Sequence, residues 1–211
     1  TFTWPDGGTT MFRGEKNTQW EGGYRVPAVI KWPGTIKPGT VINDIGAHED
    51  MLTTLLAAAG DRTVKDDLLK GRKVGDTTYK VHLDGYDLGP ALRGEAPWPR
   101  KEFIYWTDDG SVAALRYDNL KVTFLEQQAE GLHVWQEPFT ALRAPKLTNL
   151  RMDPFERAEQ ENAMGYQRWY MERMFAIAPA GAYVAQWLQS FKEFPPRQKP
   201  GSFNLDRVME A

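Results

Sequence analysis

The chain has 211 residues, a formal net charge of −2 and no cysteine. The lack of cysteine excludes disulfide bonds, thiolate metal sites and cysteine nucleophiles. The small net charge gives no electrostatic footprint for nucleic acid, and no apolar run is long enough for a membrane span, so we expect neither partner.

The first element in chain order is a loop rich in glycine that leads into an apolar segment. The loop, FRGEKNTQWEGG, carries Lys16 and Trp20, and the segment from Val26 to Trp32 follows directly. Its apolar residues follow one another instead of alternating, which is typical of a strand covered on both faces. We therefore expect a buried strand, running from about residue 24 to residue 32, with a cationic loop at its start.

Helical spacing of apolar residues follows this segment. Asn43 or Asp44 can cap a helix that stops at Gly60. The next stretch, residues 61–82, is charged and broken by glycine, so we expect a surface insertion with a short helix near its middle. A further short element is expected around Leu88 to Leu92.

Beyond Arg100 the hydrophobic period changes to two, which predicts an antiparallel sheet. Asp109-Gly110 suits a tight hairpin turn. From about Arg157 the period becomes helical, and Pro179 fits the first turn of a second helix because proline cannot continue the first. The expected strands are 103–107, 111–117, 121–126, 132–136 and 147–150, and the second helix is expected over 179–193.

These elements predict an α+β chain in two parts. Residues 1–95 would contain the buried strand and the first helices, and residues 96–211 would form an antiparallel sheet packed with C-terminal helices. The prolines at 97 and 99 mark the boundary.

A series of sequence blocks runs through nearly the whole chain. The blocks are FRGEK, WEGG, RVP and WPG near the start, PGTVINDIGAHEDMLTTLLAAAG (38–60), DGYDLGPALRG (84–94), ALRYDNLKV (114–122), LTNLRMDPFERA (147–158) and EFPPRQKP (193–200). In this order they resemble the later part of sulfatases of the arylsulfatase type, in the alkaline-phosphatase-like superfamily. The resemblance implies a C-terminal part of a longer enzyme, in which residues 1–95 complete the large α/β domain.

The resemblance gives Lys16 a role in catalysis. Taken alone, Lys16 is most simply a solvated surface lysine. Its place in the GEK-x-T-x-W-E-G-G block resembles that of the family's sulfate-contacting lysine, which binds the ester and stabilises the departing group. Trp20, on the same loop, is expected either to form a wall of the substrate site or to pack in the core.

Other parts of the family's chemistry are not matched in these residues. The formylglycine of these sulfatases is made from the Cys or Ser of a C/S-x-P-x-R motif, and Ser111, Ser190 and Ser202 each lack a proline two residues on. The segment from Glu193 to Arg197 has the Pro and Arg spacing but a glutamate at the nucleophile position. The family's Ca²⁺ ligands also have no match, and His48, His82 and His133 lack ligand spacing. We therefore expect Ca²⁺ and formylglycine in the full-length enzyme, none bound by this chain alone, and no activity from the chain by itself.

The resemblance implies a sulfuric ester hydrolase with a sulfate ester as substrate, the missing N-terminal sulfatase portion as a partner and a periplasmic or secreted location. Two alternatives stay open. One is a non-enzymatic domain that binds a sulfated glycan or a partner. The other is a hydrolase of the same superfamily that acts on a phosphodiester or phosphonate.

Overall fold

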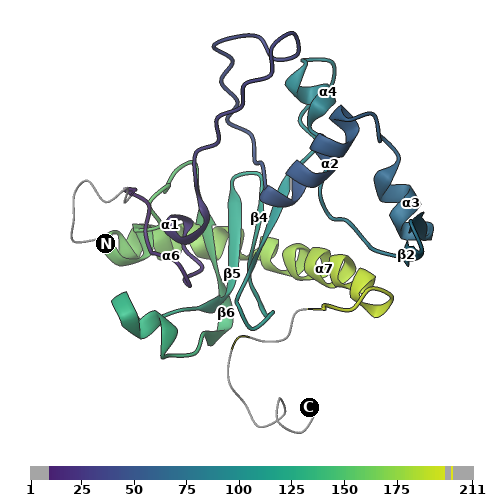
Figure 1. The fold of residues 1–211 in the computed structure, drawn as a ribbon. Helices are drawn as coiled ribbons and strands as arrows, with labels where there is room; N and C mark the ends of the chain where they lie inside the picture. Colours follow the sequence, from purple (N-terminus) through teal and green to yellow (C-terminus); the bar gives the residue numbers. More distant parts are fainter. Residues whose placement is uncertain (1–9, 198–200, 202–211) are drawn as a thin grey trace, which may run out of the picture. The chain divides into compact units, whose positions relative to one another are not determined.

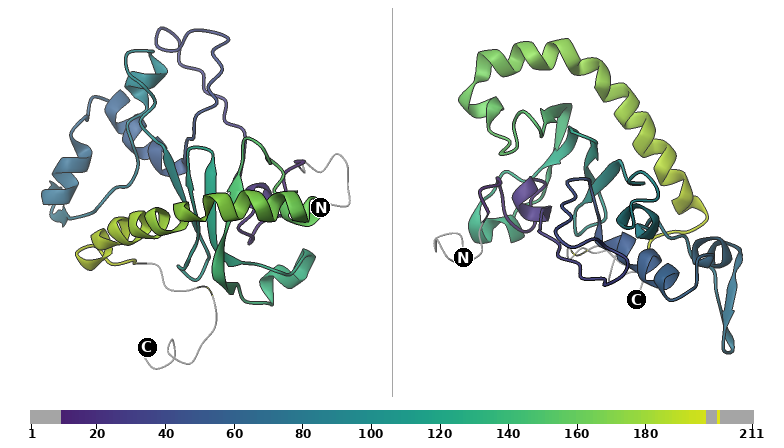
Figure 2. Two further views of the ribbon diagram at one scale, coloured as in Figure 1. Left: turned by 180° about the vertical axis from the view of Figure 1, so that it is seen from behind. Right: turned by 90° about the horizontal axis from the view of Figure 1, so that it is seen from above.

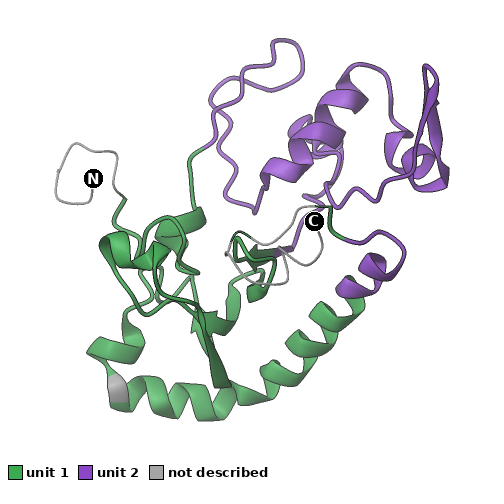
Figure 3. Ribbon diagram, turned by 60° about the horizontal axis from the view of Figure 1, so that its bottom comes forward, with its two compact units in different colours: residues 1–27, 104–187, 196–211 green, residues 28–103, 188–195 purple. Residues whose placement is uncertain are grey.

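The computed structural model describes residues 10–197 and Gly201. The described chain divides into two compact units, coloured separately in Figure 3. Unit 1 holds the residues up to Pro27, Ile104–Trp187 and the residues from Pro196 onward, and unit 2 holds Ala28–Phe103 and Leu188–Pro195. The two-domain division at residue 95 stays a prediction, and each unit is described by itself.

A four-stranded sheet forms the centre of unit 1 (Figure 1). Its strand order is β3-β4-β5-β6, and both β4–β5 and β5–β6 pair antiparallel. In the register, Val122 lies opposite Leu115 on one side and Leu147 on the other, and all three are buried. The strands are β3 (Glu102–Trp106), β4 (Val112–Tyr117), β5 (Leu120–Glu126) and β6 (Thr140–Asn149).

The predicted hairpin turn at Asp109-Gly110 is confirmed. Between β3 and β4 the N–H of Gly110 donates to Thr107 O at 3.0 Å, and Gly110 has a φ of 80° that glycine adopts without strain. Asp118, with a φ of 48°, turns the chain between β4 and β5. Aspartate tolerates this left-handed backbone better than most residues, which explains its place in the turn.

The two faces of the sheet carry different partners. Because side chains alternate along a strand, Trp106 and Tyr117 face the C-terminal helices, with ring centroids 5.7 Å from those of Trp187 and Tyr183 respectively. These helices are α6 (Ala163–Arg173) and α7 (Ile177–Trp187), joined by the 3₁₀ turn η2 (Met174–Ala176), and Figure 2 shows them crossing the sheet. Tyr105 is next to Trp106 in sequence and so faces the other way, toward the loop around α1 (Glu21–Tyr24).

Unit 2 is mainly helical. Its helices are α2 (His48–Ala58), α3 (Val64–Lys70) and α4 (Gly89–Leu92), with the 3₁₀ turn η3 (Leu188–Lys192) from the later part of the chain. An exposed hairpin of β1 (Arg72–Val74) and β2 (Thr77–Tyr79) follows α3. The predicted insertion at 61–82 therefore contains a helix and a hairpin. The helices and two antiparallel sheets confirm the α+β class.

The structure corrects three local predictions. The segment around Val26 and Val29 is not a buried strand: it forms no ladder with any strand of the described residues, and Val29 is 97% exposed. A strand needs a neighbouring strand to pair with its backbone N–H and C=O groups. Among the described residues, no strand pairs with this segment. Residues 132–136 form no strand either, because η1 (Gly131–Trp135) is a 3₁₀ helix there.

The start of α2 is the third correction. Its N-cap is Ala47, not Asn43 or Asp44, and the N–H of Ala47 donates to Asp50 Oδ2 at 2.9 Å. A carboxylate at this position satisfies a donor of the first helical turn as well as an N-cap side chain would. Among the described helices, none combines the length and the apolar character needed to cross a bilayer.

Candidate functional site

Lys16 lies at the tip of a tight turn in unit 1. The turn closes where the N–H of Thr18 donates to Glu15 O at 3.1 Å and the Thr18 hydroxyl donates to the same oxygen at 2.6 Å. Asn17 takes a φ of 64°, a left-handed backbone that asparagine accepts more readily than most residues. The Lys16 side chain is exposed, and its ammonium forms no salt bridge within the described residues. The turn therefore presents an unpaired cation to solvent.

The residues on both sides of Lys16 are tied to η1. Asn17 Nδ2 donates to Val134 O at 2.6 Å, and the N–H of Gly131 donates to Glu15 Oε1 at 2.7 Å. These contacts join positions more than 110 residues apart in sequence. Figures 1 and 2 show the purple N-terminal loop beside the green turn that contains η1. The two hydrogen bonds fix the backbone from which the Lys16 side chain extends.

Trp20 packs in the core of unit 1. Its indole is 6% exposed, and the guanidinium of Arg13 lies 3.6 Å from the ring centroid. Of the two roles considered for Trp20, core packing is thus observed. Its role as a wall of the substrate site stays a prediction.

A buried ionic cluster lies beneath the loop. Lys121 Nζ donates to Gln19 O at 2.6 Å, to Glu156 Oε1 at 2.8 Å and to Glu21 Oε1 at 3.3 Å. Glu156 Oε2 accepts the N–H of Glu21 at 2.7 Å, and the Tyr105 hydroxyl donates to Glu21 Oε1. A buried charge is tolerated only when it is paired and hydrogen-bonded. The cluster therefore fastens residues 19–21 to β5 and to the segment after β6.

The cluster sets the pKa of its carboxyl groups in opposite directions. Burial alone would raise the pKa of Glu21, but the Lys121 ammonium and the hydrogen bond from Tyr105 outweigh it and lower that pKa. Burial raises the pKa of Glu156, and Lys121 opposes the rise only in part. Burial and the charge of Glu21 also raise the pKa of Tyr105 well above its ordinary value. The network thus holds Tyr105 as a neutral hydrogen-bond donor.

Gly22 allows the loop to close on itself. A Cβ added there would lie 2.4 Å from Gly14 O and 2.5 Å from Arg13 O. Both are backbone atoms of the turn that precedes Lys16, so neither can move aside as a flexible side chain could. This close approach explains the glycine in the WEGG block.

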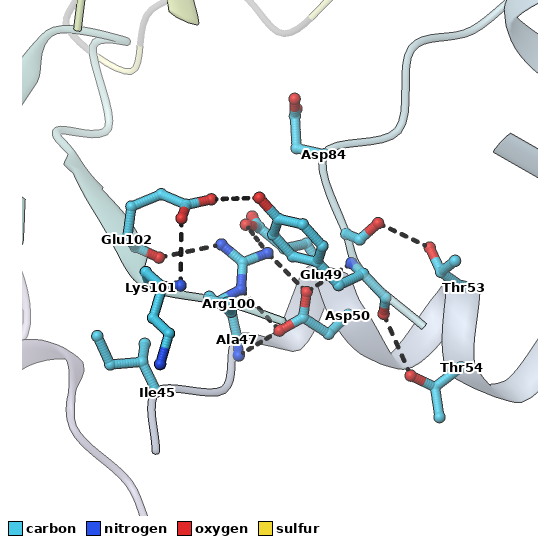
Figure 4. Close-up of polar contacts among 12 residues, drawn as sticks. Ile45, Ala47, Glu49, Asp50, Thr53, Thr54, Asp84, Arg100, Lys101 and Glu102 are labelled. Atoms are coloured by element: carbon cyan, nitrogen blue, oxygen red, sulfur yellow. Dashed lines mark hydrogen bonds and ion pairs between the residues drawn. The ribbon is translucent and has the colours of Figure 1, made fainter. Parts of the chain in front are cut away.

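A second polar cluster, in unit 2, has a structural role (Figure 4). Asp50 is buried at the start of α2, where it accepts Arg100 Nε at 2.8 Å and Arg100 Nη2 at 2.6 Å. It also accepts the N–H groups of Ala47 and Tyr86. All of its oxygens are thus used by donors within unit 2. His48, Glu49 and Asp50 form the first turn of α2.

Metal-ligating side chains do not cluster in the described residues. Within residues 10–197, no group of three or more histidine, aspartate or glutamate side chains could hold a metal ion. The Ca²⁺ expected in the full-length enzyme, which takes six to eight oxygen ligands, stays a prediction. A cavity of about 170 Å³ in unit 2 is lined by Trp32, Arg62 and Arg93 among others, and does not include the predicted site residues.

Lys16 is named from the sequence, but the contacts that hold its turn are not predicted. Asn17 within a glycine-rich loop is a typical signal for a left-handed turn. Its partner Val134 belongs to the segment 132–136, for which a strand was expected, and Gly131, the partner of Glu15, lies just before that segment. No local pattern indicates that these two segments meet.

Comparison with known proteins identifies the class. Residues 5–61 match the sulfatase family model, a range that includes Lys16 and Trp20. The chain is 31% identical to human arylsulfatase A over 157 residues, covering 69% of this chain and 28% of that protein. It is 34% identical to mouse steryl-sulfatase over 113 residues, covering 54% and 16%.

A solved structure extends the likeness to the fold. The crystal structure of the PsFucS1 sulfatase from Pseudoalteromonas sp. matches with a TM-score of 0.65 and 25% identity, covering 93% of this chain and 36% of that one. The architecture is thus that of an α+β part of a sulfatase fold. The chain is thus similar to sulfatases of the arylsulfatase type, and these matches support a C-terminal part of such an enzyme. It spans less than a third of the length of the two curated relatives named above.

Proposed function

We propose that this chain contributes Lys16 as a sulfate-binding residue to the hydrolysis of a sulfate ester. The observation that carries the proposal is the exposed Lys16 ammonium, unpaired within the described residues, on a turn held at both flanks. The turn lies within the range matched by the sulfatase family model. An ammonium is a compact donor suited to the oxygens of a tetrahedral anion.

The chemistry assigned to Lys16 is electrostatic. In hydrolysis of a sulfate ester an oxygen that comes from water bonds to sulfur and the bond between sulfur and the ester oxygen breaks. The ester oxygen takes up a proton and leaves as the alcohol, and sulfate is released. Negative charge gathers on the ester oxygen and on the sulfate oxygens, and a fixed ammonium beside them lowers the energy of that state. The backbone of Lys16 is held before substrate arrives, so only the side chain has to adjust to the sulfate.

The remaining parts of the reaction are expected from outside these residues. Formylglycine would supply the nucleophile and Ca²⁺ a further positive charge, and we expect the preceding sulfatase portion to provide the residues for both. We therefore propose that the chain is inactive alone, acts with the preceding sulfatase portion, and works in a periplasmic or secreted setting.

Sulfate binding by the 211-residue chain tests the role of Lys16. The isotope-labelled chain is titrated with sodium sulfate at constant ionic strength, with amide shifts at residues 14–18 as the readout. We expect Lys16→Ala to weaken binding about tenfold or more, the loss of one charge-assisted contact. The matched control is Lys37→Ala, which removes an exposed lysine of unit 2. Equal sulfate binding by the Lys16 variant and the wild type would contradict the proposal.

The ester class is tested separately. The full-length parent enzyme is assayed with matched phenyl esters of sulfate, phosphate and methylphosphonate. Preferential cleavage of the sulfate ester is expected, and preferential cleavage of either phosphorus ester would favour the alternative within the superfamily.

A further inference from the structure

An exposed tryptophan lies beside Lys16. Trp135 ends η1, and its side chain is 53% exposed. The Lys16 ammonium lies 5.6 Å from the centroid of the Trp135 ring, although the two residues are far apart in the sequence. No function for Trp135 is evident from local sequence, because only folding brings it to the Lys16 turn.

The position of Trp135 relative to Lys16 is set by the backbone. The hydrogen bonds from Asn17 to Val134 and from Gly131 to Glu15 fasten the turn to both ends of η1. The Val134 side chain is buried, and Gln127 Nε2 also donates to Val134 O at 3.2 Å. A contact made by Lys16 and a contact made by Trp135 can therefore be made by one ligand.

The distance between the two groups leaves the ammonium available. Cation–π attraction operates within about 6 Å of a ring centroid, and a value of 5.6 Å lies near that limit. The indole is thus a neighbour of the ammonium and not a tight partner. An anion can approach Lys16 while the exposed face of Trp135 accepts the group to which the anion is attached.

The chemistry of a sulfate ester matches this pair. Its sulfate is an anion for the ammonium, and a six-membered ring bonded to the ester oxygen offers a flat apolar face that stacks on indole. Leu132, exposed on the same turn, adds apolar surface. Trp135 offers a more open ring than Trp20, which is buried and has the guanidinium of Arg13 beside it.

We propose that Trp135 binds the organic half of the substrate by stacking on its ring while Lys16 holds the sulfate. This inference rests on the proposed function of Lys16. It assigns the substrate to sulfate esters of a ring, either aryl or pyranose, and makes η1 the part of the chain that selects it.

The test compares ligands that share the sulfate and differ in the ring. Inorganic sulfate, methyl sulfate, phenyl sulfate and glucose 3-sulfate are titrated into the 211-residue chain and into its variants. We expect at least one ring ester to bind about tenfold more tightly than methyl sulfate, as one aromatic contact provides. Trp135→Ala should abolish that preference without weakening methyl sulfate, and Trp135→Phe should retain most of it.

A control variant separates this effect from a general loss of aromatic surface. Phe175→Ala removes another exposed ring of unit 1, 73% exposed and outside η1, and should leave every affinity unchanged. The amide signals of Asn17 and Gly131 report whether the Trp135 variants keep the turn in place.

The outcomes distinguish the two proposals. If Lys16→Ala leaves inorganic sulfate binding unchanged, the function proposed for Lys16 fails. If Lys16→Ala abolishes that binding but Trp135→Ala keeps the preference for a ring, only the present inference is overturned. It is also overturned if no ring ester binds the wild-type chain more tightly than methyl sulfate.

Discussion

Lys121 Nζ lies 2.8 Å from Glu156 Oε1, and both side chains are buried in unit 1. Lys121 comes from the middle of the sheet and Glu156 from the segment after β6, where it takes a φ of 54°. Because the same ammonium also binds Gln19 O, this pair links the loop of Lys16 to the sheet.

Replacing Lys121 should strongly destabilise unit 1. Lys121→Met would leave the carboxylates of Glu21 and Glu156 buried without their cation, so we expect a loss of about 3–5 kcal/mol in the free energy of unfolding. Urea denaturation followed by circular dichroism measures the loss.

The matched control is Lys146→Met. Lys146 pairs with Glu126 and Glu159 in the same unit, but its side chain is 25% exposed. Partly exposed pairs contribute about 1 kcal/mol or less. Similar losses in the two variants would show that burial of the Lys121 cluster is not what makes it important.

A methyl group at Gly22 should disturb the turn that carries Lys16. The added carbon would meet three backbone oxygens within 2.7 Å, and we expect Gly22→Ala to cost about 1–3 kcal/mol or more, as overpacking does. It should also weaken sulfate binding, because Arg13 and Gly14 must shift.

Gly181→Ala is the opposite case. This glycine lies in α7 with open space around its Cα, so alanine should stabilise the helix by about 0.5–1 kcal/mol. Thermal unfolding of both variants checks the pair of predictions. A neutral Gly22→Ala variant would contradict the close approach described above.

Asp50 should matter far more than its neighbour Glu49. Asp50→Asn weakens four hydrogen bonds that join the start of α2 to Arg100 and Tyr86, and we expect a loss of about 3 kcal/mol. Glu49→Gln changes a carboxylate that also contacts Arg100 but is 47% exposed, and should cost about 1 kcal/mol or less. The midpoints of urea denaturation of the two variants measure the difference. A Glu49→Gln variant that is less stable than Asp50→Asn would contradict the prediction.

Tyr24 should make unit 1 sensitive to alkali. Burial, with a smaller contribution from the charge of Asp108, raises the pKa of Tyr24 from 10.0 to about 12, and its hydroxyl donates to Trp106 O. Between these two values the folded chain keeps a proton that the unfolded chain releases. Stability therefore falls as the pH rises from about 10 to about 12, by roughly 2–3 kcal/mol for this group.

The Tyr24→Phe variant isolates this contribution. It has no hydroxyl to ionise, so it should lose less stability than the wild type over the same pH range. Tyr79→Phe, which alters an exposed tyrosine of β2, should follow the wild type. Parallel pH profiles for Tyr24→Phe and the wild type would contradict the prediction.

The sequence predicted what depends on local patterns. The alternation from Glu102 to Glu126 and the Asp-Gly turn gave the hairpins, because period and turn chemistry act over a few residues. Lys16 was predicted as a site residue from its place in the GEK-x-T-x-W-E-G-G block. The Lys121 cluster could not be foreseen, because a lysine in an alternating strand reads as solvent-facing until a loop from elsewhere in the chain covers it.

The buried strand predicted around Val26 to Ile30 is wrong for the converse reason. Its apolar run is a valid strand signal, but a strand is defined by the neighbour to which it bonds, and no strand of the described chain pairs with it. The position of Trp135 could likewise not be predicted from local patterns, since η1 replaces the expected strand.

The discontinuous make-up of unit 1 has a practical consequence for anyone who wishes to express it separately. A clone that starts at Ile104 would retain every residue from β4 to β6 yet lack Glu21 and the backbone oxygen of Gln19, so the ammonium of Lys121 would lose two of its three acceptors. A workable minimal version has to rejoin residues 10–27 to the sheet, and a short linker or coexpression of the two pieces would show whether they reassemble.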